Sequence, residues 1–387
     1  MTGETWKRAC VRGGETTERA SFGETTGRAS FVVVATLFLA TVLAPSSVQA
    51  QQGRPGGRQA PPTYRHIATI PVGGEGFWDY LAADRASQRL YVSHGTKVVV
   101  IDTRANRVVG EIDDLPGVHG MALAPGLGLG FASDGRENAA AFVDLKTLKV
   151  TKRVKTGENP DAILYVPGFD EVYTFNGRSQ DATVIDAKSG DVVATIPLPG
   201  KPEFAVYDPR SKRIYNNIED RGEIAVIDPS THKVVATWPI SPGAEASGLA
   251  IDVAHQRLFA VCGNGLMVMV NAQTGAVVDN VPVGRGPDAV RYDPGLGLAF
   301  ASNGEGTVTI AHEDGPDRLR VVQTLKTQPS ARTMALDPTT HRIYLSAAQV
   351  ETLPPDSSSN GRRRRRIVPN SFRVLVYGPG QAMGPGR

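Results

Sequence analysis

One short segment, built around a central aromatic residue, recurs seven times along this chain of 387 residues. Two copies have nearly identical flanks, since GLGLGFASDG at 126–135 is repeated as GLGLAFASNG at 295–304. Successive aromatics are separated by 40, 42, 42, 44, 41 and 44 residues. A repeat of this length restricts the chain to architectures that copy one supersecondary unit. The aromatics are Tyr91, Phe131, Tyr173, Tyr215, Phe259, Phe300 and Tyr344.

Each repeat contains four short segments that suit β-strands and are separated by turn residues. In the fourth copy, FAVYD at 204–208 precedes a turn, and the aromatic strand follows it. A β-branched strand then ends at Asp228, and VVATW at 234–238 completes the unit. No segment of the sequence keeps a helical period through three turns. Four antiparallel strands in about 40–45 residues predict an all-β, seven-bladed β-propeller with the aromatics packed between blades.

The two ends of the repeat region complement each other. The seventh copy has three strand-like segments and then only a tail rich in Gly and Pro. Before the first copy, YRHIATIPV at 64–72 resembles the fourth strands of other repeats. We therefore expect this N-terminal strand to complete the last blade, which closes the ring and removes two exposed sheet edges. The propeller is thereby assigned to residues 64–378.

The segment before the repeats has the pattern of an export signal. Phe31–Ala44 is a predominantly apolar run, Arg28 precedes it, and the small residues Val48 and Ala50 suit a cleavage site. We expect residues 1–50 to be an N-terminal extension and signal peptide that is cleaved after Ala50. The mature protein would then be periplasmic or extracellular and would have no transmembrane span. An uncleaved anchor is the alternative.

Composition sets further bounds on the mature protein. Residues 51–63 are interpreted as a linker and residues 379–387 as a flexible tail. Only Cys262 remains after cleavage, so the fold depends on its core rather than on an intrachain disulfide. The formal net charge of the full chain is only +3, which creates no overall field that would attract nucleic acid or a membrane. We expect a monomer.

The repeated motifs resemble those of the bacterial YncE-like, or YVTN-repeat, seven-bladed β-propellers. The resemblance rests on the aromatic strand [LI]-[YF]-[VA]-[ST], on the turn V-I-D-x-x-[ST] and on a lead-in of type G-x-x-P-[DE]. The lead-in is written GENPD at 157–161 and GRGPD at 284–288. The resemblance covers residues 64–378 and implies an exported binding or scaffold module. Relatives on this architecture include lactonases and domains of redox enzymes, so the fold alone does not choose an activity.

Binding sites concentrate on loops that a rigid scaffold holds in place. In a propeller, the loops that enter the first strands share one face with the loops between the second and third strands. We call this the top face, and we expect a ligand to bind there at the central channel. The expected ligand-binding residues are Asp79, His119, Asp161, Glu203, Asp288 and Arg332.

Two subsets of top-face residues have the donor types of metal sites, and no other cofactor is indicated. The first subset is His94, His119, Asp79 and Asp134, whose imidazoles and carboxylates suit a divalent transition metal. The second subset is Asp79, Asp161, Glu203 and Asp288, whose hard oxygen donors suit Ca²⁺. No short spacing such as H-x-x-x-H supports the first subset, and Asp after Pro is ordinary turn chemistry. Unrelated polar loop residues are therefore the alternative for both.

A run of arginines interrupts the last repeat within the segment Ala347–Ser371. The flanking sequence PPDSSS at 354–359 predicts a disordered loop, which would emerge on the top face. Such a run attracts nucleic acid or acidic partners, although no aromatic residues alternate with it to stack bases. A solvated loop is the alternative. The run consists of Arg362, Arg363, Arg364, Arg365 and Arg366.

The sequence lacks the nucleophile and metal-hydrolase motifs G-x-S-x-G and H-E-x-x-H. We therefore interpret the protein as a non-catalytic binding or scaffold module for a small molecule or a protein. The alternative is a metal-dependent hydrolase of the lactonase type, whose ion would polarise a lactone carbonyl and activate water. Nucleic-acid or acidic-partner binding through the arginine run is a third hypothesis. His232, His255 and His341 fall on turns of the opposite face and receive no predicted role.

Overall fold

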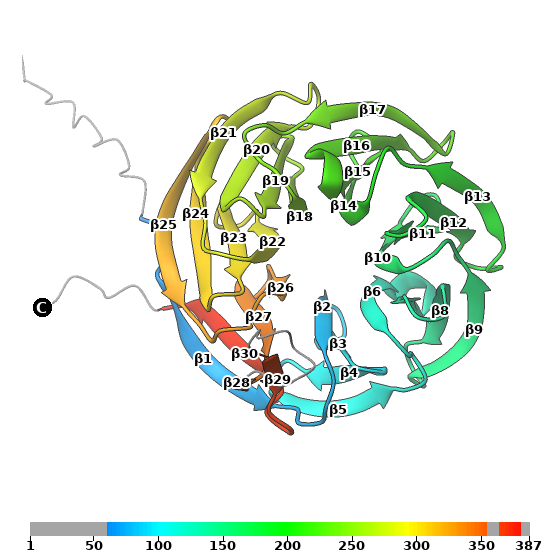
Figure 1. Ribbon diagram of the computed structural model, residues 1–387, viewed down its shortest axis with the longest axis horizontal. Coiled ribbons are helices and arrows are strands. Elements are labelled where there is room, and N and C mark those ends of the chain that lie inside the picture. Colours follow the sequence, from blue (N-terminus) through cyan, green and yellow to red (C-terminus); the bar gives the residue numbers. More distant parts are fainter. Residues whose placement is uncertain (1–59, 354–363, 381–387) are drawn as a thin grey trace, which may run out of the picture. The chain divides into compact units, whose positions relative to one another are not determined.

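The computed structural model describes residues 60–353 and 364–380. The expected export signal, most of the linker, Arg362, Arg363 and the tail beyond residue 380 lie outside these ranges. Within them, seven four-stranded antiparallel sheets form the blades of a ring, as Figure 1 shows. The predicted seven-bladed β-propeller is confirmed. None of the helices among the described residues has the length and apolar character needed to cross a membrane.

The four strands of each blade are ordered from the central channel to the outer rim, as Figure 1 shows. The innermost strands are β2 (Trp78–Asp84), β6 (Val118–Ala124), β10 (Pro160–Val166), β14 (Pro202–Asp208), β18 (Ala246–Asp252), β22 (Pro287–Asp293) and β26 (Met334–Asp337). The second strands are β3 (Arg89–His94), β7 (Leu129–Asp134), β11 (Glu171–Asn176), β15 (Arg213–Ile218), β19 (Arg257–Cys262), β23 (Leu298–Asn303) and β27 (Arg342–Ala347).

The third and fourth strands complete the blades. The third strands are β4 (Lys97–Asp102), β8 (Ala139–Asp144), β12 (Asp181–Asp186), β16 (Glu223–Asp228), β20 (Leu266–Asn271), β24 (Thr307–Gly315) and β30 (Arg373–Pro379). The outermost strands are β5 (Arg107–Ile112), β9 (Lys149–Lys155), β13 (Val192–Pro197), β17 (Lys233–Pro239), β21 (Val277–Pro282), β25 (Arg318–Lys326) and β1 (Tyr64–Pro71). Two short 3₁₀ turns, η1 (Pro125–Leu127) and η2 (Glu219–Arg221), lie in loops.

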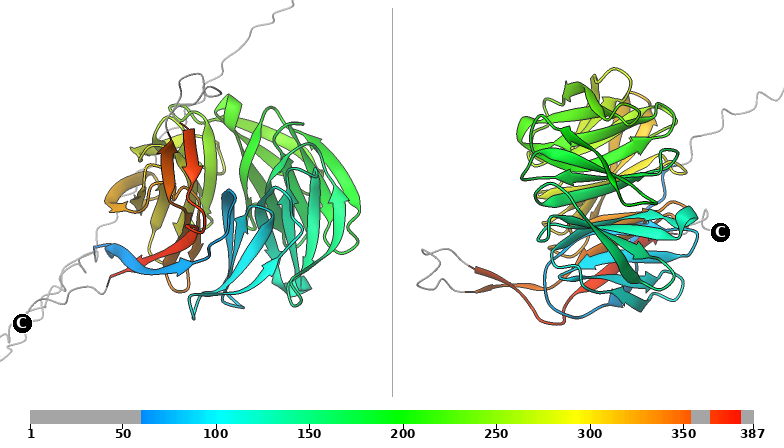
Figure 2. Two further views of the ribbon diagram at one scale, coloured as in Figure 1. Left: turned by 60° about the horizontal axis from the view of Figure 1, so that its bottom comes forward. Right: turned by 90° about the vertical axis from the view of Figure 1, so that its right-hand side faces the viewer.

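The ring closes as the sequence predicts. The last blade has the strand order β26-β27-β30-β1, so its outermost strand comes from the N-terminal end of the described chain. The pairing of β1 with β30 is antiparallel and runs from Tyr64 opposite Pro379 to Pro71 opposite Arg373. Figure 2 shows the blue N-terminal strand beside the red C-terminal strand.

The core consists of apolar clusters that join adjacent blades. All seven repeated aromatics are buried, with no more than 1% of each exposed. Tyr91 of the first blade packs with Val118 and Ala132 of the second. Each blade therefore buries its faces against its neighbours, which explains why the aromatic recurs in every repeat. Cys262 is also buried in this core.

Repeated aspartates end strands through local hydrogen bonds. Asp186, at the end of β12, accepts the backbone N–H groups of Lys188 and Ser189 at 2.9 and 2.7 Å. Asp102 does the same for Arg104 and Ala105. An Asx turn of this kind satisfies backbone donors that would otherwise lack partners, so the V-I-D motif sets the ends of strands.

The innermost strands of the fifth and sixth blades approach each other closely at Gly248. A Cβ atom at this position would lie 2.7 Å from the carbonyl oxygen of Asp288 and 2.7 Å from the backbone nitrogen of Val290. Because these are backbone atoms, a methyl group would force the two blades apart. We expect Gly248→Ala to lower the free energy of unfolding by about 1–3 kcal/mol in urea denaturation.

Gly126→Ala is the matched control for this prediction. A Cβ atom at Gly126 would meet nothing within 4 Å, so we expect a change below about 0.5 kcal/mol. Equal stabilities of the two variants would contradict the close approach of the blades.

The arginine-containing segment differs from the predicted disordered loop at its two described ends. Here β28 (Val350–Leu353) pairs antiparallel with β29 (Arg364–Ile367). Glu351 lies opposite Arg366 and accepts a hydrogen bond of 2.6 Å from its Nε atom. Ile367 packs against the core between the seventh and first blades, so backbone pairing and an apolar anchor order these ends. Figure 2 shows the hairpin projecting from the ring.

Candidate functional site

A β-bulge at the start of an inner strand positions most of the candidate side chains. In β2 the pairing with β3 is interrupted between Trp78 and Leu81, and five other inner strands have a bulge at the equivalent point. A bulge leaves a residue outside the ladder and redirects its side chain. The first residues within these six bulges are Asp79, His119, Asp161, Glu203, Ser247 and Asp288.

The first three blades bring their bulge residues into one cluster. The Nδ1 atom of His119 lies 2.9 Å from Oδ2 of Asp79 and 3.1 Å from Oδ1 of Asp161. Burial disfavours the charged imidazole, but the hydrogen bond to Asp79 and the negative charge of Asp161 outweigh this effect and raise the pKa of His119. The donor atoms of these three residues converge closely enough to surround a metal ion.

A second cluster extends the site to the fourth blade. The Nζ atom of Lys201 donates to Oε1 of Glu203 at 2.8 Å and also forms an ion pair with Glu219 in η2. Sequence reasoning did not select Lys201 as a site residue. Lys201 lies in GKPE at 200–203, which resembles the lead-in but is one residue shorter, and this position is the signal that could have identified it.

Arg332 connects the last blade with its two neighbours. Its Nη1 atom donates to Oδ2 of Asp288 at 2.5 Å, and its Nη2 atom lies 4.0 Å from Oδ1 of Asp79. The hydroxyl of Thr333 donates to the backbone carbonyl of Asp79 at 2.8 Å. Five of the six predicted ligand-binding residues therefore form one chain of contacts around the channel mouth, namely Asp79, His119, Asp161, Asp288 and Arg332. The sixth, Glu203, pairs with Lys201 and is close enough to Asp161 for their charges to repel.

Carboxylates outnumber cations in this chain of contacts and the Lys201 cluster taken together, and burial makes several of the carboxylates difficult to ionise. Burial and repulsion by Asp161 raise the pKa of Glu203 to about 8. Burial raises the pKa of Asp288 to about 6 despite the nearby guanidinium of Arg332. The pKa of Asp161 is also raised by burial. The site thus has a surplus of acidic groups that are incompletely neutralised by protein cations.

The raised pKa of Glu203 has a consequence for stability. A carboxyl group with a raised pKa in the folded state stabilises the fold at low pH, and this contribution is lost as the pH rises through about 8. We expect Glu203→Gln to match the wild type near pH 5. Near pH 9 its free energy of unfolding should be about 1–3 kcal/mol higher, because no buried charge forms.

Urea denaturation across this pH range tests the expectation for Glu203. Glu158→Gln is the control, since Glu158 is exposed on the same face and its substitution should leave the pH dependence unchanged. If the wild type and Glu203→Gln lose stability equally between pH 5 and pH 9, ionisation of Glu203 is not the cause.

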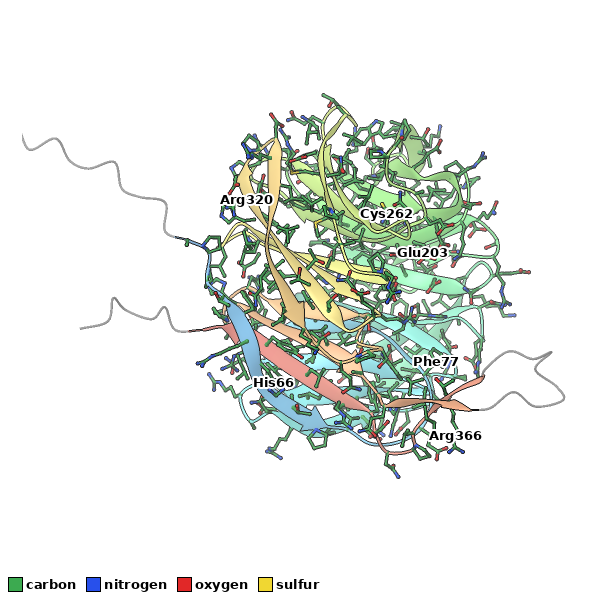
Figure 3. The ribbon with its side chains drawn as sticks, turned by 60° about the vertical axis from the view of Figure 1, so that its left-hand side comes forward. His66, Phe77, Glu203, Cys262, Arg320 and Arg366 are labelled. Carbon is green, nitrogen blue, oxygen red and sulfur yellow. The ribbon has the colours of Figure 1, made fainter. Side chains whose placement is uncertain are left out.

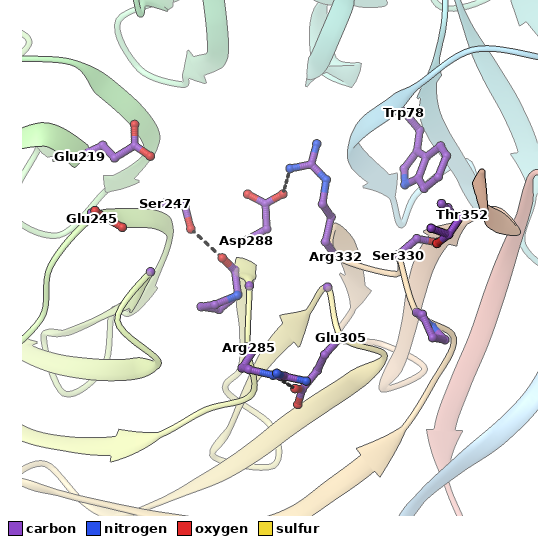
Figure 4. A pocket seen from close by; sticks show the side chains of 16 residues that line it. Trp78, Glu219, Glu245, Ser247, Arg285, Asp288, Glu305, Ser330, Arg332 and Thr352 are labelled. Atoms are coloured by element: carbon purple, nitrogen blue, oxygen red, sulfur yellow. Dashed lines mark hydrogen bonds and ion pairs between the residues drawn. The ribbon is translucent and has the colours of Figure 1, made fainter. Parts of the chain in front are cut away.

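A cavity of about 890 Å³ opens beside the acidic chain of contacts, as Figure 4 shows. Asp288 and Arg332 contribute to its wall, and the ion pair of Arg285 with Glu305 lies at its edge. Val350 and Thr352 of β28 also line it, so the base of the inserted hairpin belongs to the top face. Figure 3 shows the hairpin with Arg366 projecting on the side of the ring where Phe77 lies.

Bulky side chains occupy the channel beneath the acidic residues. The rings of Tyr80 and Phe204 have centroids 5.0 Å apart, and the guanidinium carbon of Arg291 lies 4.6 Å from the centroid of Phe204. Burial lowers the pKa of Arg291 to about 10. The acidic residues therefore lie above a layer that is partly aromatic and partly cationic.

The first predicted metal subset does not assemble. His94 ends a second strand, and its ring stacks on Phe372 with centroids 4.1 Å apart. Burial lowers the pKa of His94 to about 4. Asp134, at the end of β7, is fully buried and accepts the N–H of Glu137 at 3.3 Å. Because second strands end in the interior between blades, Asp161 rather than these two residues completes the cluster of His119 and Asp79.

The second predicted metal subset is divided by protein cations. Asp79 and Asp161 share His119, whereas Glu203 is paired with Lys201 and Asp288 with Arg332. The four carboxylates do not converge on one point among the described residues. All four lie at the starts of innermost strands, but the sequence could not predict which cation each would contact.

Comparisons with known proteins agree with the fold. Neither a protein-family model nor a curated protein matches the sequence. Among solved structures, the chain is similar to Kuenenia stuttgartiensis hydrazine synthase, with a TM-score of 0.62 and 17% sequence identity. The match covers 79% of this chain and 98% of that chain. At this level of identity, the likeness supports the propeller fold alone.

Proposed function

We propose that this protein is an exported β-propeller of the YncE-like, YVTN-repeat type that binds a positively charged ligand on its top face. The observation that carries the proposal is the surplus of buried and half-buried carboxylates at the channel mouth. They are Asp79, Asp161, Glu203, Glu219 and Asp288, and the permanent cations among them are Lys201 and Arg332.

A cationic ligand relieves the electrostatic cost of this arrangement. Glu203 and Asp288 have raised pKa values because burial penalises their charged forms. An ammonium or guanidinium group restores the charged forms and forms charge-assisted hydrogen bonds with them. Because Glu203 is mostly protonated at neutral pH, binding of a cation should release a proton.

The cavity beside these residues, whose wall includes Glu219 and Asp288, limits the size of the ligand. A cavity of about 890 Å³ falls within the range of roughly 300–1,000 Å³ that is usual for small-molecule sites. Trp78 adds an aromatic surface to this wall. These dimensions favour a small organic amine or a lysine or arginine side chain presented by another protein.

Isothermal titration calorimetry with spermidine tests the proposal, with citrate as the anionic control. We expect spermidine to bind with an affinity that falls as salt is added. Citrate should not bind. In two buffers of different ionisation enthalpy, the heats at pH 7 should differ because a proton is released. Equal binding of citrate, or no binding of spermidine, would overturn the proposal.

The cluster of Asp79, His119 and Asp161 favours a second candidate, a metal-dependent hydrolase of the lactonase type. Its donor atoms are 2.9 and 3.1 Å apart, which suits neighbouring ligands of one ion. A bound ion would polarise a lactone carbonyl and activate water. Melting with EDTA and then with added Zn²⁺ or Ca²⁺ should reveal stabilisation of about 2.7 kcal/mol at 100 times the Kd.

The variant His119→Ala decides whether this cluster holds the ion. Loss of metal-dependent stabilisation in His119→Ala, together with lactone hydrolysis by the wild type, would favour the hydrolase. If metal ions stabilise this variant as much as the wild type, the ion does not bind at the top-face cluster and the hydrolase candidate fails.

A further inference from the structure

A cluster of three ionisable side chains lies at the opposite end of the inner strands from the acidic top-face residues. Asp252 ends β18, His255 lies in the turn that follows it, and Glu313 belongs to β24 of the next blade. The Nδ1 atom of His255 lies 2.6 Å from Oδ2 of Asp252 and 3.3 Å from Oε1 of Glu313. The cluster therefore bridges the fifth and sixth blades.

Both carboxylates of this cluster are removed from solvent, and one of their oxygen atoms accepts no hydrogen bond. The side chains of Asp252 and Glu313 are 3% and 1% exposed, whereas that of His255 is 53% exposed. The Oε2 atom of Glu313 accepts the hydroxyl of Tyr292 at 2.5 Å. Its buried Oε1 atom has no hydrogen-bond donor within the described part of the chain. A buried carboxylate oxygen without a donor is costly unless a cation satisfies it.

Neighbouring cations are engaged elsewhere. The guanidinium of Arg257 pairs with Asp317 at 2.8 Å. Arg210 donates from Nη1 to the backbone carbonyl of Ala254 at 3.1 Å. The imidazole of His255 thus faces two buried carboxylates, and burial together with the charge of Asp252 raises the pKa of Glu313.

We propose that Asp252 Oδ2, His255 Nδ1 and Glu313 Oε1 bind a divalent transition metal of the Zn²⁺ class that joins the fifth and sixth blades. Ligands about 2.0–2.2 Å from one tetrahedral ion lie roughly 3.3–3.6 Å from each other. The 3.3 Å between His255 and Glu313 already suits a shared ion, and the 2.6 Å contact of His255 with Asp252 must lengthen when the ion enters. One imidazole and two carboxylates suit Zn²⁺, Co²⁺ or Ni²⁺ better than Ca²⁺. Tyr292 orients Glu313 from behind, as outer partners of metal ligands commonly do.

Because the imidazole of His255 is exposed, the ion can enter from solvent. Water can complete the coordination of the ion on its solvent side. Binding requires that His255 be neutral and both carboxylates ionised, so the ion replaces protons in the cluster. Because the ion binds residues of two blades in the folded state, it stabilises the assembled ring by mass action.

Two other histidines provide internal controls. His341 Nδ1 lies 2.7 Å from Oδ2 of Asp293, and His232 Nε2 lies 2.9 Å from Oε1 of Glu171. Each also joins two blades, but neither belongs to a three-residue donor cluster among the described residues. If His255 only pairs with carboxylates, as the other two histidines do, then none of the three should affect the affinity for Zn²⁺. If His255 is a metal ligand, only its substitution should weaken Zn²⁺ binding.

The test is titration of the purified protein with Zn²⁺ by calorimetry, with Co²⁺ absorption spectra as a second measurement. We expect His255→Ala to weaken the binding of Zn²⁺ about tenfold or more and His341→Ala to leave it unchanged. Because His255 is exposed, its substitution should preserve the fold, which circular dichroism checks. Glu313→Gln should weaken binding as well.

The variant His119→Ala separates this site from the top-face cluster. If Zn²⁺ affinity and stoichiometry are unchanged in His255→Ala, or if the wild type binds no Zn²⁺, the proposal fails. If only His119→Ala loses the ion, the metal belongs to the top face and the proposal also fails. Spermidine binding is measured separately, so its absence would overturn the proposed function without affecting this result.

Discussion

Replacing Tyr64 by alanine should lower the free energy of unfolding by about 3–5 kcal/mol, which is the usual cost of truncating a buried aromatic residue. Tyr64 is 1% exposed, and its ring lies 4.9 Å from that of Phe300 in the sixth blade. Its hydroxyl donates to the carbonyl of His341 at 2.8 Å. The substitution therefore weakens both the packing and the hydrogen bonding that anchor the closing strand β1.

The measurement for Tyr64→Ala is urea denaturation, with Ile67→Ala as the control on the same strand. Ile67 is 43% exposed, so its substitution should cost less than about 1 kcal/mol. If Tyr64→Ala is as stable as Ile67→Ala, then closure by β1 contributes little to holding the ring together.

Asp288→Asn should weaken the binding of spermidine about 30-fold or more. Asp288 lines the cavity, and its carboxylate lies 2.5 Å from the guanidinium of Arg332. The substitution removes a negative charge and leaves the positive charge of Arg332 facing the ligand. Loss of one partner of a buried charge pair typically costs 2–5 kcal/mol of binding free energy.

The opposite change provides the sharpest control for this prediction. Arg332→Gln removes the competing cation, so it should tighten spermidine binding, whereas Glu158→Gln should change the Kd less than about twofold. The Kd values of all three variants are measured by calorimetric titration with spermidine under the same conditions. Equal weakening by Asp288→Asn and Arg332→Gln would indicate a structural effect and would contradict a site selected for cations.

The periodic features of the fold could be predicted from the sequence because every blade solves the same packing problem. Tyr91 and its six counterparts must fill the space between blades, so the aromatic recurs at blade spacing. The resemblance of residues 64–72 to other outer strands predicted the closure by β1 for the same reason. The lead-in residues, including Asp79 and Asp288, lie in equivalent bulges at the starts of innermost strands, since equivalent positions of a repeat occupy equivalent places.

The partners of these residues depend on side-chain directions that the repeat does not encode. Whether a residue falls inside a bulge, as Asp161 does, or ends a second strand, as His94 does, decides whether it faces the channel or the interior. In the predicted set of His94, His119, Asp79 and Asp134, the structure therefore keeps His119 and Asp79 together and adds Asp161 in place of the other two.

The sequence by itself determined the number of blades, the closing strand and the face that carries the acidic residues, because these follow from hydrophobic periodicity and covalent order. Only the tertiary structure decided which charges meet. Strands β19 to β23 separate His255 from Glu313 along the chain, yet the donor atoms of these two residues lie 3.3 Å apart. Contacts between blades depend on the register and twist of two sheets, and neither is written in the local sequence of either one.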